Sequence, residues 1–158
     1  MYNWIGDVMN LGFASDHRGY KLKEDLIHYF EEYGYNIVDY GTNSEESCDY
    51  PDFAYKLGNG VLNNEVDFGI AICGSGIGIS IALNKMKGIY CAKVSNPEEA
   101  MYTRLDNNTN CIAIGEKMDL NNAILSIEAF ITTEYSYLEK HERRIKKLKQ
   151  IENGEYHG

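Results

Sequence analysis

The sequence has no long hydrophobic run, and its acidic residues outnumber its basic ones. Its 158 residues include 15 Lys and Arg against 24 Asp and Glu, which gives a formal net charge of −9. We therefore expect no nucleic-acid partner and no membrane partner, because both surfaces are anionic. No apolar stretch approaches the roughly 20 residues needed to span a bilayer. The opening segment, MYNWIGDVMN, also lacks the basic start and long apolar run of a signal peptide.

Cysteine is scarce, and its four residues follow no paired pattern. Cys48, Cys73, Cys91 and Cys111 are widely spaced, without a CxxC motif or Cys/His pairing. This spacing fits neither a disulfide framework nor a zinc site. We therefore expect a reducing compartment, a cytoplasmic location and no metal.

The rest of the composition is that of one ordinary globular domain, with 44% hydrophobic and 25% charged residues. Short runs that are apolar throughout suit strands covered on both faces, and predict strands at 10–15, 36–40, 67–73, 88–94 and 110–115. Helical spacing predicts helices near 22–33, 54–61, 96–105, 123–131 and 138–148, and a helix-like stretch follows "CGSGIG". The alternation predicts a three-layer, doubly wound α/β fold with helices on both faces of a parallel sheet. We expect one domain at 10–152, an N-terminal extension at 1–9 and a flexible tail at 153–158.

Polar clusters follow three of the predicted strands. "SDHRG" comes after the first strand, "CGSGIG" after the third and "SNPEE" after the fourth. In doubly wound folds, ligands bind beyond the carboxyl ends of the strands. The fold therefore brings Asp16, His17, Cys73 and Ser75 to one edge of the sheet.

The segment "GIAICGSGIG" raises the question of what Cys73 does. Its glycines imitate part of a dinucleotide fingerprint, but the spacing is GxGxG, and "AKVSN" stands where an acidic ribose ligand is expected. The loop instead offers close backbone approach and free N–H groups at a helix start, which suit a developing oxyanion. Cys73 is then either a buried strand residue or a thiolate favoured by that helix start. The glycines directly after it favour the reactive interpretation.

Several segments carry a family resemblance: "SDHRGYKLKEDL", "VDYGTNSEESCDYPDFA", "ICGSGIGISIALNKMKGIYCA", "NNTNCIAIG" and "HERRIKKL". In order and spacing they resemble the type B ribose-5-phosphate isomerases, a family that includes galactose-6-phosphate isomerase subunits and allose-6-phosphate isomerases. The resemblance implies a Rossmann-like, five-stranded parallel sheet in a homodimer or a dimer of dimers, with active sites shared between chains. It also implies isomerisation of ribose 5-phosphate and ribulose 5-phosphate in the pentose phosphate pathway, without a cofactor. The loop "GTNSEESCDYPDFA" favours the ribose branch over the galactose branch.

The resemblance implies roles for the residues of the glycine loop. Cys73 is the base that takes a proton from C2 and returns it to C1 through a cis-enediolate. Backbone amides of the loop, at Gly74, Gly76 and Gly78, hold the enediolate oxygens. Ser75 serves the proton exchange between O1 and O2, although the same residue also suits a helix N-cap.

Other matched residues bind the substrate. The Asn107 side chain also holds the enediolate, while His17 and Arg144 bind the phosphate, Arg144 from the partner chain. The basic run "KHERRIKKLK" that contains Arg144 is otherwise typical of a solvated helix face. Where many relatives have arginine, this chain has Lys117 and Lys140, which keep the charge but lose bidentate geometry. We expect phosphate binding to survive in a weaker form.

The largest departure from the family lies at Asp106, where relatives have a histidine that opens the furanose ring together with the aspartate matching Asp16. A carboxylate is a poor proton donor at neutral pH. Asp16 and Asp106 therefore either share a proton as a facing pair, or ring opening is slow, or Asp106 is inert. The departure keeps two other functions open. These are an isomerase of a six-carbon sugar phosphate, allose 6-phosphate or galactose 6-phosphate, and a catalytically silent sugar-phosphate-binding protein.

Overall fold

Strands and helices alternate along the chain and build one parallel sheet. The computed structural model describes residues 6–158. Its strands are β1 (Asn10–Ser15), β2 (Asn36–Asp39), β3 (Phe68–Cys73), β4 (Cys91–Lys93) and β5 (Cys111–Gly115). All of them pair in parallel, in the order β2-β1-β3-β5-β4. The predicted five-stranded, doubly wound parallel sheet is confirmed.

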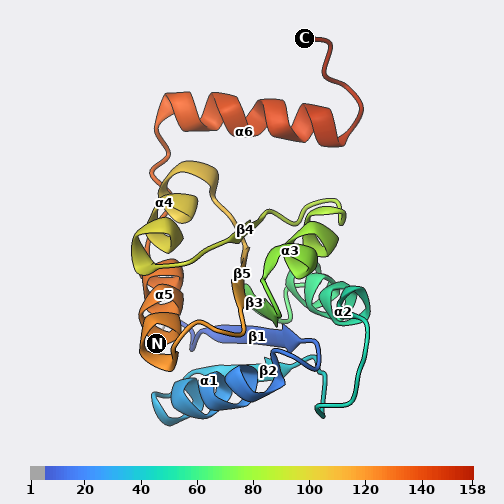
Figure 1. Ribbon diagram of the computed structural model, residues 1–158. Helices are drawn as coiled ribbons and strands as arrows, with labels where there is room; N and C mark the ends of the chain where they lie inside the picture. Colours follow the sequence, from blue (N-terminus) through green and yellow to red (C-terminus); the bar gives the residue numbers. More distant parts are fainter. Residues whose placement is uncertain (1–5) are drawn as a thin grey trace.

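Helices cover both faces of this sheet (Figure 1). One face carries α1 (Tyr20–Glu32), α4 (Pro97–Asn107) and α5 (Leu120–Thr132). The other carries α2 (Tyr50–Leu62) and α3 (Ile77–Asn84). The last helix, α6 (Glu139–Glu152), lies apart from these layers beside the end of α4.

The two faces of the sheet differ in the size of their side chains. On the three central strands, large apolar residues face α1 and α5, and they are Leu11, Phe13, Ile70, Ile72, Ile112 and Ile114. Small residues face α2 and α3, among them Ala14, Ala71, Cys73, Cys111 and Ala113. Because side chains alternate along a strand, this large–small alternation in the sequence fixes which face each helix layer covers.

Two predicted elements differ from those observed. The fourth strand is confined to Cys91–Lys93, because Ile89 N donates to Met86 O at 3.0 Å and Tyr90 N to the side-chain oxygen of Asn110 at 3.0 Å. These bonds hold the preceding residues outside the sheet. The second helix begins at Tyr50, earlier than the predicted 54, and it contains Gly58 and Gly60; a Cβ at Gly60 would collide with the Tyr40 side chain. Close packing against the Tyr40 side chain thus outweighs the poor helix propensity of glycine.

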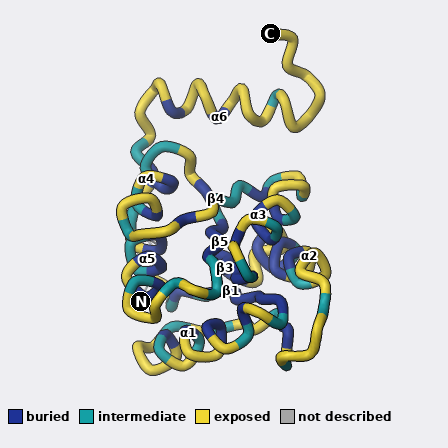
Figure 2. The backbone as a smooth tube through the Cα atoms, viewed as in Figure 1, coloured by how far each residue is buried: buried dark blue, intermediate teal, exposed yellow. Residues whose placement is uncertain are grey.

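Helix α6 is fixed to the domain at both of its ends. Near its start, Ser136 N donates to Leu105 O at 3.2 Å, and His141 is buried. At its end, Glu152 accepts bonds from Gly88 N at 2.9 Å and from the Tyr90 hydroxyl at 3.2 Å. Figure 2 shows that most of the helix is nevertheless exposed.

The chain ends bear on the predicted domain limits. Of the predicted N-terminal extension at 1–9, residues 1–5 lie outside the described residues, while Met9 is buried in the core. The predicted tail at 153–158 is exposed throughout. Within residues 6–158, no helix combines the length and the apolar composition needed to cross a membrane.

Candidate active site

The candidate site lies where neighbouring strands send their helices to opposite faces. Strand β1 leads into α1 on one face, and its neighbour β3 leads into α3 on the other. Such a switch point leaves a crevice beyond the carboxyl ends of the two strands. Asp16 and His17 follow β1 there, and Cys73 and Ser75 stand at the end of β3, so the structure brings these predicted residues to one edge.

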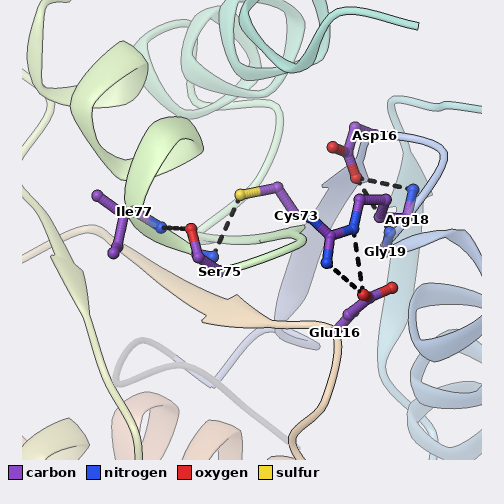
Figure 3. A network of polar contacts seen from close by, with 8 residues as sticks. Asp16, Arg18, Gly19, Cys73, Ser75, Ile77 and Glu116 are labelled. Atoms are coloured by element: carbon purple, nitrogen blue, oxygen red, sulfur yellow. Dashed lines mark hydrogen bonds and ion pairs between the residues drawn. The ribbon is translucent and has the colours of Figure 1, made fainter. Parts of the chain in front are cut away.

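Cys73 meets the glycine loop through its sulfur. The residue is only 4% exposed, and Sγ accepts a hydrogen bond from Gly76 N at 3.2 Å (Figure 3). This amide and the positive end of α3 both stabilise negative charge on the sulfur. Gly76 has φ +79°, and a Cβ there would lie 2.8 Å from the backbone carbon of Ile114, so glycine is required at this position.

Ser75 is not the N-cap of α3, which is the structural role that the sequence suggested for it. That position belongs to Gly76, whose left-handed backbone turns the chain into α3. Ser75 stands one residue earlier, is exposed, and its Oγ accepts a bond from Ile77 N at 3.1 Å. Its hydroxyl hydrogen is therefore free to point towards a ligand beyond the strand ends.

Asp16 is buried and oriented by the turn that follows it. Its Oδ1 accepts bonds from Arg18 N and Gly19 N, both at 3.0 Å. A Cβ at Gly19 would lie 2.6 Å from the carbonyl oxygen of Ile72, so this tight approach to β3 needs glycine. His17 accepts a bond at Nδ1 from Cys48 N at 3.2 Å. The neutral imidazole therefore carries its proton on Nε2, which makes that nitrogen a donor.

A polar cavity of about 390 Å³ lies beside the glycine loop. It is lined by residues that end or follow β3, β4 and β5, including Gly74, Ser75, Lys93 and Lys117, and by Asn122 of α5. The sequence analysis missed Lys93 and Asn122, although the position of Lys93 at the end of the fourth predicted strand is a usable signal. A larger cavity of about 540 Å³ lies over β2 and α2, but it contains none of the predicted residues. We therefore place the site by its chemistry rather than by cavity size.

Four predicted residues lie at the opposite edge of the sheet. Helix α4 runs from the end of β4 to the start of β5, so Asp106 and Asn107 stand where the strands begin, whereas Cys73 pairs with Gly115 where they end. Lys140 and Arg144 lie on α6 beside that same edge, and both are exposed. Within one chain, the structure does not bring Asp106 to Asp16.

Asp106 instead contacts a buried histidine of its own chain. Its Oδ1 lies 3.4 Å from Nε2 of His141, and Nδ1 of the same ring lies 2.7 Å from Ser136 Oγ. The Asp106 side chain is 47% exposed, so one side of this carboxylate faces outward. Sequence reasoning gave His141 no role in the site, although the residue begins the quoted family segment "HERRIKKL".

Two of the remaining cysteines lie on strands of the sheet. Cys91 and Cys111 pair opposite each other on β4 and β5. Burial raises the pKa of the Cys111 thiol to about 12 and raises that of Cys91 well above its ordinary value. All four cysteines are free thiols, and residues 6–158 contain no cluster of His, Cys, Asp and Glu that could hold a metal.

Known proteins resemble the chain over nearly its whole length. The model of the family described as Ribose/Galactose Isomerase matches residues 11–148. The chain belongs to the ribose/galactose isomerase family. Ribose-5-phosphate isomerase B of Escherichia coli is 37% identical over 146 residues, which cover 92% of this chain and 97% of that protein. The matched range 11–148 includes the predicted site residues at both edges described above.

Solved structures agree with this assignment. Ribose-5-phosphate isomerase B of Clostridium thermocellum superposes with a TM-score of 0.89 at 38% identity, covering 94% of this chain and all (100%) of that one. Ribose-5-phosphate isomerase B of Mycoplasma genitalium, solved with bound ribulose-5-phosphate, superposes with a TM-score of 0.84 at 32% identity. That match covers 92% of this chain and 97% of the Mycoplasma chain. The fold and the family are therefore settled together.

Proposed function

We propose that this protein is an aldose–ketose isomerase that interconverts ribose 5-phosphate and ribulose 5-phosphate. The observation that carries the proposal is the Cys73 sulfur at the start of α3, with Gly76 N donating to it at 3.2 Å. A sulfur in this setting is suited to accept and return one proton. The Escherichia coli relative and the Mycoplasma genitalium relative with bound ribulose-5-phosphate support this substrate.

The reaction moves two hydrogens and leaves the carbon chain intact. Cys73 takes the proton from C2 of the open aldose, the C2 electrons form a C1=C2 bond, and O1 gains the negative charge. The proton then returns from sulfur to C1, while the O2 hydroxyl proton passes to O1. The hydroxyl of Ser75 serves this exchange between the oxygens. Amides of Gly74 and Gly78 hold the developing charge, which is where fixed donors contribute most, while the predicted donor Gly76 N is bonded to the Cys73 sulfur.

The phosphate requires cations and donors at the other end of the substrate. His17 offers its Nε2 proton, because Nδ1 accepts a bond from Cys48 N. Lys117 lines the polar cavity beside Ser75. We assign Lys140 and Arg144 to the phosphate and Asn107 to the enediolate, all three from a second chain.

The position of these residues supports a homodimer with shared sites. Asp106, Asn107 and Arg144 lie at the edge opposite Cys73, so one chain alone cannot combine them. Ile77 and Ile81 lie one turn apart on α3, directly after the glycine loop, and are 56% and 54% exposed. Exposed apolar residues beside a polar site favour a protein interface there. We further infer a cytoplasmic enzyme of the pentose phosphate pathway.

A coupled assay with three substrates tests the proposal. Purified protein is assayed with ribose 5-phosphate, allose 6-phosphate and galactose 6-phosphate at equal concentrations, with Cys73→Ala as the control. The largest kcat/KM is expected for ribose 5-phosphate. A preference for either six-carbon sugar would replace the substrate assignment, and binding without turnover of all three would make the protein a silent binder.

A further inference from the structure

An ion pair joins the loop after β1 to the loop after β5, on either side of the glycine loop. Arg18 donates from Nε at 3.1 Å and from Nη2 at 2.7 Å to Oε1 of Glu116, a residue 98 positions away in the sequence (Figure 3). Arg18 follows β1 and Glu116 follows β5. Because β3 lies between these strands, the ion pair spans the end of the strand that carries Cys73.

Arg18 and Glu116 each contact residues of the candidate site as well. Glu116 N donates to Cys73 O at 2.9 Å and to Gly74 O at 3.3 Å, which fixes the start of the glycine loop. The guanidinium of Arg18 packs on Gly74 so closely that a Cβ there would collide with it. Arg18 N in turn donates to Asp16 Oδ1. The pair therefore connects Asp16, the glycine loop and the loop after β5 in one network.

The ion pair between Arg18 and Glu116 contributes little to the stability of the fold. The Arg18 side chain is 53% exposed and that of Glu116 is 26% exposed. Ion pairs this close to solvent contribute little to the free energy of unfolding. The pKa of Arg18 is raised, chiefly by the hydrogen bond and charge of Glu116 and to a smaller degree by the charges of Asp16 and Cys73. A group so placed acts on the geometry of its neighbours rather than on the fold.

We propose that Arg18 and Glu116 form a clamp that sets the position of the Gly74–Gly78 amides relative to Asp16. This inference rests on the proposed function and makes both residues positioning residues of the isomerase reaction. The amides must lie within hydrogen-bond distance of the enediolate oxygens, and small displacements of such groups lower the rate steeply. The clamp thus acts on kcat, and it leaves substrate binding nearly unchanged.

Steady-state kinetics of four variants test the clamp. Arg18→Met and Glu116→Gln should each lower kcat by about ten-fold, with KM within about two-fold of wild type. The double variant should be no slower than either single one, because both changes break one contact. Arg18→Lys, which keeps the charge, should be intermediate. Lys21→Met is the matched control, since Lys21 is a neighbouring exposed lysine paired with Glu45 at 3.7 Å, and its kinetics should equal those of wild type.

Two kinetic results would overturn the clamp. A raised KM in Arg18→Met, with Glu116→Gln unaffected, would mean that Arg18 binds the substrate directly. Wild-type kcat in both variants would mean that the pair does nothing for the reaction. Hydrogen exchange of residues 74–78 gives a readout that needs no turnover: exchange must accelerate in Arg18→Met and Glu116→Gln but not in Lys21→Met, and unchanged exchange also refutes the clamp. An inactive wild type with accelerated exchange in the variants would refute the proposed function alone.

Discussion

Asp106 contacts His141 through a carboxylate–imidazole distance of 3.4 Å, between Oδ1 and Nε2. Ser136 holds the other ring nitrogen at 2.7 Å, so the ring is fixed from both sides. The imidazole is buried and the carboxylate is the exposed member of the pair. Any substrate that meets this pair therefore meets a carboxylate first.

Ring opening is expected to limit the forward reaction. If Asp106 does not open the furanose, forward velocity will stop rising with enzyme concentration once it reaches the rate of spontaneous ring opening. Asp106→His should remove this plateau and speed turnover of the cyclic aldose, because an imidazole exchanges protons readily near neutral pH. The measurement is initial velocity with ribose 5-phosphate over a wide range of enzyme concentration.

Ribulose 5-phosphate is the control for this prediction. It cannot close a furanose ring, so its conversion should stay proportional to enzyme concentration in both proteins. A forward velocity that remains proportional in the wild type would contradict the prediction. Asp106 and His141 would then open the ring as they stand, and His141→Gln should create the plateau.

Cys73→Ala should abolish turnover while leaving the fold intact. The side chain lies on the small-residue face of the sheet, where alanine occurs at equivalent positions. Removal of a general base typically costs roughly a hundred- to ten-thousand-fold in rate. Circular dichroism and ligand binding check the fold, and coupled kinetics check turnover. Near-normal kcat would return Cys73 to the role of a core residue.

Alkylation should separate the functional thiol from the structural ones. A thiol with a pKa of about 12, as burial gives Cys111, is ionised to roughly one part in ten thousand at pH 8. Iodoacetamide should therefore modify Cys73 before Cys91 or Cys111, and ribose 5-phosphate should slow that modification. Peptide mass spectrometry gives the order, and Cys48→Ser removes the remaining thiol. Early modification of Cys111 in the folded protein would contradict the burial argument.

The fold was predictable because its signals are local. Continuous apolar runs mark the strands, and glycine, asparagine and proline mark the helix ends, as at Asn96, whose side chain accepts a bond from Glu99 N at 2.8 Å. The fourth strand was predicted too long because Asn110, twenty residues downstream of Tyr90, supplies the bonds that keep Tyr90 out of the sheet. A hydrogen bond from a distant side chain does not change the hydrophobic pattern from which a strand is predicted.

The site was predictable only where its residues follow strands directly. Asp16 and Cys73 stand at strand ends, so parallel topology alone brings them together. The ion pair between Arg18 and Glu116 joins residues far apart in sequence, and no pattern in either segment predicts that they are in contact. Buried charges were missed for the same reason. Lys23 is fully buried because Asp39, on a different element, accepts from its Nζ at 2.8 Å with both oxygens.

Mixed dimers test whether each active site takes residues from two chains. Cys73→Ala removes the base at the strand-end edge, and Arg144→Ala removes the phosphate ligand on α6 at the opposite edge. Each variant alone should have little activity, for different reasons. A mixed dimer, however, contains one site with both defects and one site with neither. Random exchange makes half of the dimers mixed, so about a quarter of the wild-type sites should be restored.

The exchange itself must be measured before the activity is interpreted. One variant carries a mass or affinity tag, and native mass spectrometry follows formation of mixed dimers after mild dilution or denaturation and refolding. Activity should rise in parallel with the mixed species and should stay at baseline when either variant is treated alone. Mixed dimers without recovered activity would place Arg144 and Cys73 of one chain in the same site, which the separation of α6 from the end of β3 opposes. A chain that remains monomeric and active would exclude shared sites altogether.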